Sequence, residues 1–349
     1  MDIGTLLQLT IDRNASDLHI ISGYYPSIRV NGDLYQLNNT EVITATDAKK
    51  LLFELISSEQ KENLLSNREI DLGIDYNGHR FRLNIYYTKN GLSGAFRLIS
   101  TTIKTIEELN LPAIINKTKD LSQGLVLLTG PTGEGKSTTL AAIINDINTK
   151  YSKHIITIED PVEYVYPVSK SIISQRELHQ DTHSWQVALR SALREDPDVI
   201  LVGEMRDYDT IDLALTAAET GHLVFSTLHT SSASEAINRM IDIFPANQQN
   251  QIKSQLSAEL QMVVSQKLLP RLDKPGRIPA AEILIINPAV ASLIREGKTH
   301  LINNVMLTSE GEGMILFEKC LSNLYQAGKI SRDTAMSYAI RPKELENLI

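Results

Sequence analysis

The sequence predicts an α/β protein of two domains, a small α+β domain followed by a larger domain with a mainly parallel sheet. Its 349 residues are enough for two hydrophobic cores. Short strands separated by Asn-Gly turns occupy the first hundred residues, and apolar strands alternate with helical segments beyond residue 120. We therefore expect an N-terminal domain at 1–100, an interdomain linker at 101–120, an α/β domain at 121–288 and a helical region at 289–349.

Local patterns in the first hundred residues predict two helices and several short strands. Residues 5–12 should form an amphipathic helix, and a second helix should begin near Thr46, with Thr46 or Asp47 as its N-cap. A strand begins at Asp17, and the turn Asn31-Gly32-Asp33 should close a hairpin. A meander of three strands ends the domain, at residues 70–76, 79–88 and 94–99.

The larger domain is predicted from strands of a different character. These strands are continuously apolar, which is typical of parallel strands buried on both faces. They lie at residues 125–129, 155–158, 199–202 and 223–228. A turn at residues 273–276 precedes a further strand at 278–286, and the chain from Ala289 onward is predicted to be helical. This order favours a mainly parallel sheet covered by helices on both faces.

The composition is typical of an ordinary globular protein, with 42% hydrophobic and 22% charged residues. No apolar run approaches the roughly 20 residues of a membrane-spanning helix, and the amino terminus lacks the pattern of a signal peptide. The single cysteine, Cys320, permits neither an internal disulfide nor a cysteine zinc cluster. We therefore expect a cytoplasmic protein, and a formal net charge of −8 gives it no general attraction for nucleic acid.

The strongest chemical signal lies between the strand at 125–129 and a helix that begins near residue 136. Residues Gly130-Pro131-Thr132-Gly133-Glu134-Gly135-Lys136-Ser137 fit the phosphate-loop pattern G-x-x-x-x-G-K-[ST] at every fixed position. The glycines allow main-chain N–H groups to point into one concavity, and the helix adds its own N–H groups and dipole. Lys136 would contact the β- and γ-phosphates and Ser137 would ligate Mg²⁺. The segment therefore predicts binding of a nucleoside triphosphate.

Glu134 is an unusual member of this loop, because it brings a carboxylate close to a polyanion. Two unit charges about 7 Å apart in partly hydrated surroundings repel by roughly 0.5–2 kcal/mol. This repulsion is tolerable if the side chain points to solvent or meets an arginine, so Glu134 is not evidence against nucleotide binding.

Glu204 is the strongest catalytic candidate outside the loop. It follows the apolar residues 199–202 and Gly203, a pattern typical of the strand that runs beside a phosphate loop in ATPases. A carboxylate there can orient the attacking water or hold the water shell of Mg²⁺. The alternative is a solvated acid at a strand end.

Two further strand ends carry candidate side chains at the edge where open α/β sheets bind ligands. The segment after the second strand holds Glu159, Asp160 and Glu163, and the pattern alone leaves the choice among these carboxylates open. His229 follows the fourth strand, where it could sense the γ-phosphate, hydrogen-bond Glu204 or be purely structural.

Two arginines of the meander are further candidates. Alternation places Arg82 on the face opposite Phe81 and Leu83, and Arg97 alternates in the same way with its apolar neighbours. Arginines on an open sheet face are often simply solvated. The alternative is that both project toward the nucleotide.

A pair of histidines, His179 and His183, lies four residues apart and would share a helix face. Such spacing invites a metal interpretation. Because no cysteine or third histidine lies at ligand spacing, the pair does not predict a metal site.

Several stretches along nearly the whole chain resemble the ATPases of type IV pilus and type II secretion machines, in particular the pilus-retraction branch. Together they are far more specific than a lone phosphate loop. They are ASDLH at 15–19, GPTGEGKSTTLAAIIN at 130–145, TIEDPVEY at 157–164, SQRELHQDT at 174–182, ALRSALREDPDVILVGEMRD at 188–207 and TAAETGHLVFSTLHT at 216–230.

The resemblance implies a PAS-like N-terminal domain, a RecA-like ATPase domain with a helical C-terminal tail, and nucleotide bound between the two domains. It implies six subunits in a ring that hydrolyses ATP with Mg²⁺ and powers pilus retraction, and hence twitching motility. The implied partner is an inner-membrane platform protein, which places the ring at the cytoplasmic face of the inner membrane. No nucleic-acid partner and no integral membrane segment are expected.

The resemblance also assigns site residues. Glu204 would be catalytic, Glu163 would arrange Mg²⁺ and water, and Arg82 and Arg97 would complete the closed site. His229 would act in catalysis. The residues expected to bind nucleotide are Gly130, Pro131, Thr132, Gly133, Glu134, Gly135, Lys136, Ser137, Thr138 and His222. Those expected to hold Mg²⁺, partly through water, are Ser137, Glu163 and Glu204.

Two positions depart from the family pattern. Glu134 stands where serine is usual, and Ala291-Ser292 replaces an Arg-Asn pair within the retraction signature at 289–296. The chain lacks the four-cysteine zinc subdomain that is usual in extension and secretion ATPases. The alternatives are an extension, secretion or accessory ATPase of the same family, a RecA-like nucleic-acid motor, and a ring that binds nucleotide without hydrolysing it.

Overall fold

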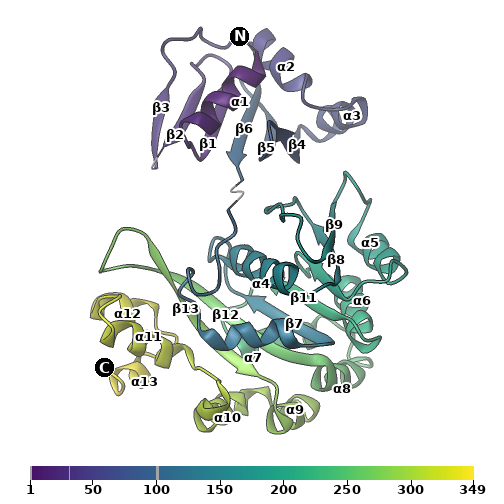
Figure 1. Ribbon diagram of the computed structural model, residues 1–349, viewed down its shortest axis with the longest axis vertical. Coiled ribbons are helices and arrows are strands. Elements are labelled where there is room, and N and C mark those ends of the chain that lie inside the picture. Colours follow the sequence, from purple (N-terminus) through teal and green to yellow (C-terminus); the bar gives the residue numbers. More distant parts are fainter. Residues whose placement is uncertain (1, 31, 100–101) are drawn as a thin grey trace. The chain divides into compact units, whose positions relative to one another are not determined.

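Two units, each with its own hydrophobic core, make up the computed structural model, which describes residues 2–30, 32–99 and 102–349 (Figure 1). One unit comprises Met1–Thr102 with Pro161–Tyr166, and the other Ile103–Asp160 with Pro167–Ile349. The expected turn residue Asn31 and the expected boundary at residues 100 and 101 lie outside the described residues. Within the described ranges, no helix is long and apolar enough to cross a membrane.

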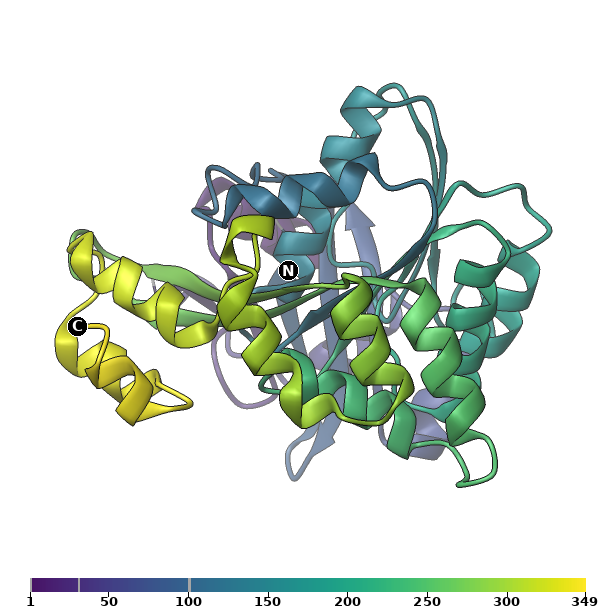
Figure 2. The same cartoon turned by 90° about the horizontal axis from the view of Figure 1, so that it is seen from below.

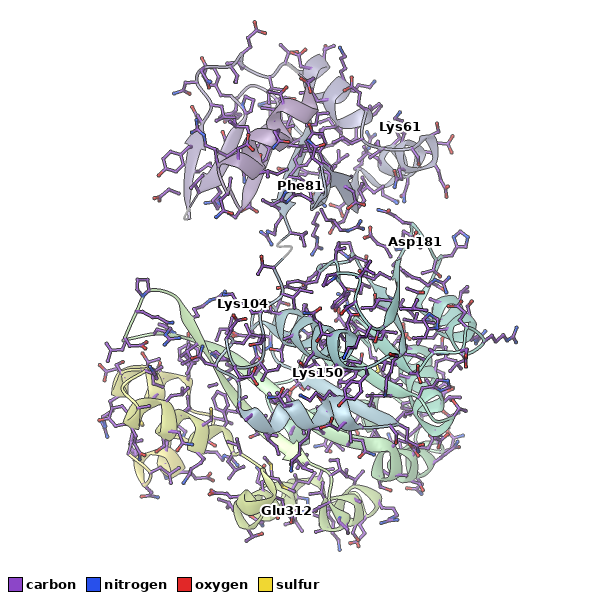
Figure 3. The ribbon with its side chains drawn as sticks, viewed as in Figure 1. Lys61, Phe81, Lys104, Lys150, Asp181 and Glu312 are labelled. Carbon is purple, nitrogen blue, oxygen red and sulfur yellow. The ribbon has the colours of Figure 1, made fainter. Side chains whose placement is uncertain are left out.

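The first unit is an antiparallel sheet in the order β3-β2-β1-β6-β5-β4, with helices on one face. Leu52 of α2 packs against Gly94 of the sheet, and Phe81 lies fully buried in the same core (Figure 3). The strands are β1 (Asp17–Ile21), β2 (Ser27–Val30), β3 (Asp33–Gln36), β4 (Glu69–Tyr76), β5 (His79–Thr88) and β6 (Gly91–Leu98). The helices are α1 (Ile3–Asp12), α2 (Ala45–Phe53) and α3 (Ser58–Asn67).

The start of α2 differs from the sequence prediction. Thr44, not Thr46 or Asp47, is the N-cap, because its hydroxyl accepts the N–H of Asp47 while the Asp47 carboxylate accepts the N–H of Thr44. This reciprocal capping box satisfies two main-chain donors at once, which a cap at Thr46 would not. The following helix, α3, was not predicted, and it begins with a similar box between Ser57 and Gln60.

The second unit is a seven-stranded sheet in the order β13-β12-β7-β11-β10-β8-β9. All neighbouring strands are parallel except the β12–β13 pair, so the predicted mainly parallel sheet is confirmed. The strands are β7 (Gly124–Thr129), β8 (His154–Glu159), β9 (Ile172–Glu177), β10 (Val199–Val202), β11 (Leu223–Leu228), β12 (Leu260–Pro270) and β13 (Arg277–Ile285). Strands β9 and β12 were not predicted.

Helices cover both faces of this sheet (Figure 2). The 3₁₀ helix η1 (Ala113–Asp120) packs against α4 on one face, and α5 to α8 share a core with the other face. These helices are α4 (Lys136–Lys150), α5 (Trp185–Ala192), α6 (Tyr208–Glu219), α7 (Ala233–Asp242) and α8 (Gln249–Glu259).

The chain beyond β13 is helical, as expected. Its segments are α9 (Pro288–Arg295), η2 (Thr299–Leu301), α10 (Ile302–Thr308), η3 (Glu310–Glu312), α11 (Phe317–Gln326), α12 (Arg332–Tyr338) and α13 (Pro342–Glu346). Helices α11, α12 and α13 form a separate small core with residues from β12 and β13 (Figure 1). The predicted fold class is thus confirmed: an α+β N-terminal unit, an α/β unit with a phosphate loop, and a helical tail.

Candidate functional site

The phosphate loop lies between the end of β7 and the start of α4, as the sequence predicts. Gly130 has φ 145°, and a side chain there would collide with the main-chain oxygen of Gln266. Gly135, with φ 83°, is the N-cap of α4 and offers no side-chain cap to the helix. The N–H groups of the first turn are therefore available to a bound anion, which the helix dipole also favours.

Lys136 lies at the first position of α4 and is almost fully buried, with 8% of its surface exposed. Its Nζ donates to the carbonyl oxygens of Gly130 at 2.7 Å and Pro131 at 2.9 Å. These bonds hold the ammonium against the loop, where a phosphate group would meet it. Ser137 follows on the same turn and is half-buried.

Among the described residues, the Glu134 carboxylate bonds to a main-chain N–H rather than to an arginine, the partner considered above. Its Oε2 accepts a hydrogen bond from the main-chain N–H of Leu268 on β12. Its main-chain oxygen accepts a second bond, at 2.6 Å, from Nε2 of Gln266. The carboxylate is therefore engaged by the neighbouring strand.

The sheet order corrects one sequence-based expectation. The strand before Glu204, β10, does not run beside β7, because β11 lies between them. Two strand spacings, each about 4.8 Å, separate the ends of β7 and β10 by about 10 Å. This separation leaves room for a terminal phosphate and a water molecule between the loop and the Glu204 carboxylate.

Glu204 is held by two cationic or potentially cationic partners. Its Oε1 lies 2.9 Å from His229 Nε2, and its Oε2 lies 2.7 Å from Arg206 Nη2. Burial raises the pKa of Glu204, but Arg206 and then His229 and Lys136 lower it, and the net pKa is below the ordinary value. The carboxylate is therefore ionised at neutral pH and able to accept a proton or a hydrogen bond from water.

Glu204 and His229 border a cavity of about 430 Å³. Arg206, Thr230 and residues of α7 also line it. A cavity of this volume can hold water and a small ligand beside the carboxylate.

His222 lies at the opposite end of β11 from His229, roughly 20 Å along the strand. Its Nδ1 is 2.9 Å from the carbonyl oxygen of Ala217 and 3.1 Å from the Thr220 hydroxyl, at the end of α6. Within one chain, the structure does not bring His222 to the phosphate loop.

The first unit contains three of the predicted site residues. Arg82 and Arg97 lie directly opposite each other on β5 and β6. Each is held by a carboxylate, since Arg82 Nη2 lies 2.5 Å from Asp71 and Arg97 Nε lies 3.1 Å from Asp17. Glu163 lies in the segment Pro161–Tyr166, which belongs to the same unit.

The histidine pair does not share a helix face. His179 lies in a turn with φ 65°, because Leu178 and Thr182 form an isolated bridge around it. No group of three or more histidine, cysteine or acidic side chains among the described residues could hold a metal ion.

Sequence reasoning missed three residues of the site. Arg206 is close to Glu204 in sequence, and its position two residues further on was a usable signal. Gln266 and Thr139 were not detectable, because their side chains meet at 2.8 Å across 127 positions of sequence. Only the three-dimensional fold brings them together.

The chain is similar to known proteins over nearly its whole length. A model of the family described as type II/IV secretion system protein matches residues 2–343. The type IV pilus retraction ATPase PilT of Pseudomonas aeruginosa is 44% identical over 344 residues, 98% of this chain and 99% of that protein. A twitching motility protein of Neisseria gonorrhoeae is 48% identical over 311 residues, covering 89% and 83%.

The likeness extends to a solved structure. A crystal structure of the pilus retraction motor PilT with bound ADP has a TM-score of 0.93 and 42% identity, and the match covers 99% of each chain. This chain therefore belongs to the type II/IV secretion system protein family.

Proposed function

We propose that this chain is a Mg²⁺-dependent ATPase motor that powers retraction of a type IV pilus. One observation carries the proposal: an uncapped phosphate loop on β7 faces an ionised Glu204 two strands away. The near full-length likeness to a pilus retraction ATPase supports the same activity.

Nucleotide binding rests on the loop itself. The N–H groups of the loop and of the first turn of α4 surround the phosphates, and Lys136 adds a full positive charge. Ser137 would offer a hydroxyl oxygen to Mg²⁺, an ion that prefers oxygen ligands. Bound Mg²⁺ supplies charge neutralisation for the phosphates in the transition state.

Hydrolysis rests on Glu204, which orients the attacking water. Arg206 and His229 keep its carboxylate ionised and fix its direction. Phosphoryl transfer depends mainly on positioning and charge stabilisation. The contacts from Arg206 and His229 hold the Glu204 carboxylate in place before the nucleotide binds.

The remaining residues act when the domains close. Arg82 and Arg97 lie together on one sheet face and would approach the phosphates, with Glu163 arranging Mg²⁺ and water. In this structure each of the two guanidinium groups is paired with a carboxylate, Asp71 for Arg82 and Asp17 for Arg97. We further propose that six copies form a ring at the cytoplasmic face of the inner membrane, where cycles of closure move a membrane platform protein.

Complementation of a strain that lacks the gene tests the motor role. The parent chain should restore retraction and surface motility, whereas Lys136→Ala and Glu204→Gln should leave cells with excess pili that do not retract. Cells that lack pili when the gene is deleted would instead indicate an extension motor. Purified protein that releases phosphate only with DNA or RNA would contradict the pilus assignment.

A further inference from the structure

Glu134 forms a connection between the phosphate loop and the neighbouring strand. The loop lies beside β12, and the Glu134 carboxylate reaches the N–H of Leu268 on that strand. Gln266, which is 3% exposed, donates to the Glu134 main-chain oxygen at 2.6 Å and accepts from the Thr139 hydroxyl at 2.8 Å. One glutamine therefore joins the loop to α4, and one glutamate joins the loop to the strand.

The N–H of Leu268 needs such a partner because the β7–β12 ladder ends before it. The last paired residues are Thr129 and Ser265, and beyond them the β7 chain turns away into the phosphate loop. The Glu134 carboxylate takes the place of the missing strand as the hydrogen-bond acceptor.

We propose that Glu134 is a positioning residue, which fixes the phosphate loop to β12 and so holds it in its nucleotide-binding form before nucleotide arrives. The hydrogen bond from the Leu268 N–H also directs the negatively charged Glu134 carboxylate toward that N–H group. A serine at this position ends two carbon–carbon bonds earlier, each about 1.5 Å, and does not reach Leu268. The inference rests on the proposed nucleotide binding by this loop.

The simplest competing interpretation is that Glu134 only repels the phosphates. The two interpretations predict opposite signs for Glu134→Ala. If the carboxylate only repels, its removal strengthens nucleotide binding, because a like charge is lost. If the carboxylate positions the loop, its removal weakens binding, because the loop must be ordered by the nucleotide itself.

The binding experiment uses the full chain with ADP and with ATP and Mg²⁺. Glu134→Ala and Glu134→Ser should raise the Kd for ADP and the KM for ATP about tenfold, with a smaller change in kcat. Glu134→Gln keeps an oxygen acceptor and should recover most of the affinity. Glu62→Ala removes an exposed carboxylate on α3 as a control and should change neither constant. Unchanged or tighter binding by Glu134→Ala would overturn the proposal.

A second measurement follows the bond directly, without nucleotide. Hydrogen exchange of the peptide that contains Leu268 should be faster in Glu134→Ala than in the parent, and close to the parent rate in Glu134→Gln. Equal exchange in all three would refute the connection. The exchange measurement does not depend on nucleotide, so it tests only the bond between Glu134 and Leu268. A failure of the proposed ATPase function would be seen separately, because the parent chain would then not bind ADP.

Discussion

A buried charge cluster fastens the C-terminal helices to the sheet. Glu318 on α11, 1% exposed, accepts from Arg341 Nε at 3.1 Å and Nη2 at 2.6 Å. It also accepts from the N–H groups of Ile340 and Arg341. Glu282 on β13, also 1% exposed, lies 3.8 Å from the same guanidinium and accepts from the N–H of Ala233 at 2.8 Å. One arginine thus serves two buried carboxylates.

The substitution Arg341→Ala should therefore be strongly destabilising. Breaking a buried ion pair by removing one partner typically costs about 3–5 kcal/mol. The two bonds to Glu318, at about 1.5–3 kcal/mol each for charged groups, give a similar sum. A loss of about 3–5 kcal/mol lowers Tm by roughly 10 °C in a domain of this size. Arg341→Lys should lose less stability than Arg341→Ala, because lysine keeps the positive charge although it cannot form the bidentate hydrogen bonds of arginine.

The loss should also depend on pH. Burial raises the pKa of Glu282, so the folded state binds a proton more readily than the unfolded state. The contribution of Glu282 to the free energy of unfolding is therefore fully present below the ordinary glutamate pKa of the unfolded chain. It is lost as the pH rises from that value through the higher pKa of the folded state. Without Arg341 the pKa rises further, so Arg341→Ala should lose more stability near pH 8 than near pH 5.5.

The assay is urea unfolding of each variant, followed by the fluorescence of the single tryptophan, Trp185, which lies in the second unit. Arg332→Ala, an exposed arginine on α12, is the matched control and should change stability by less than about 0.5 kcal/mol. A loss below about 1 kcal/mol for Arg341→Ala, or a loss that shrinks as the pH rises, would refute the reasoning.

Three further predictions concern other parts of the chain. Arg206→Ala should raise the pKa of Glu204, because it removes the main group that lowers that pKa, and the acid limb of the pH–rate profile for ATP hydrolysis should move to higher pH. An unmoved limb would contradict this assignment. Gly130→Ala should abolish ADP binding in a titration, since its methyl group meets the Gln266 oxygen, and parental affinity would show that the loop can shift. Thr44→Ala should cost about 1 kcal/mol in thermal unfolding of the first unit through loss of the capping box, whereas an equal loss in Thr46→Ala would favour the other cap.

Features that are marked by a contiguous stretch of residues could be predicted from the sequence. The phosphate loop is a contiguous pattern, and Glu204 follows a contiguous apolar run, so the strands that precede them were predicted at the residues where the structure has β7 and β10. Strand β12 escaped because it follows α8 directly at Leu260, with no glycine or proline to mark the change. The partners of Glu134 lie on that strand and were lost with it.

Sheet order was the second limit. Hydrophobic runs identify parallel strands but do not say which strands are neighbours, and β11 was therefore not expected between β7 and β10.

The N-cap of α2 was misplaced for a related reason. Thr44 and Thr46 are both suitable caps by type, and only the position of the Asp47 carboxylate decides between them.

The most direct test of the central claim is to measure ATP binding and phosphate release by Glu204→Gln beside the parent chain, with Mg²⁺ at saturating ATP. We expect the variant to bind ATP about as well as the parent and to release phosphate at least about 100-fold more slowly. Phosphate release by Glu204→Gln at close to the parental rate would contradict the role of this carboxylate.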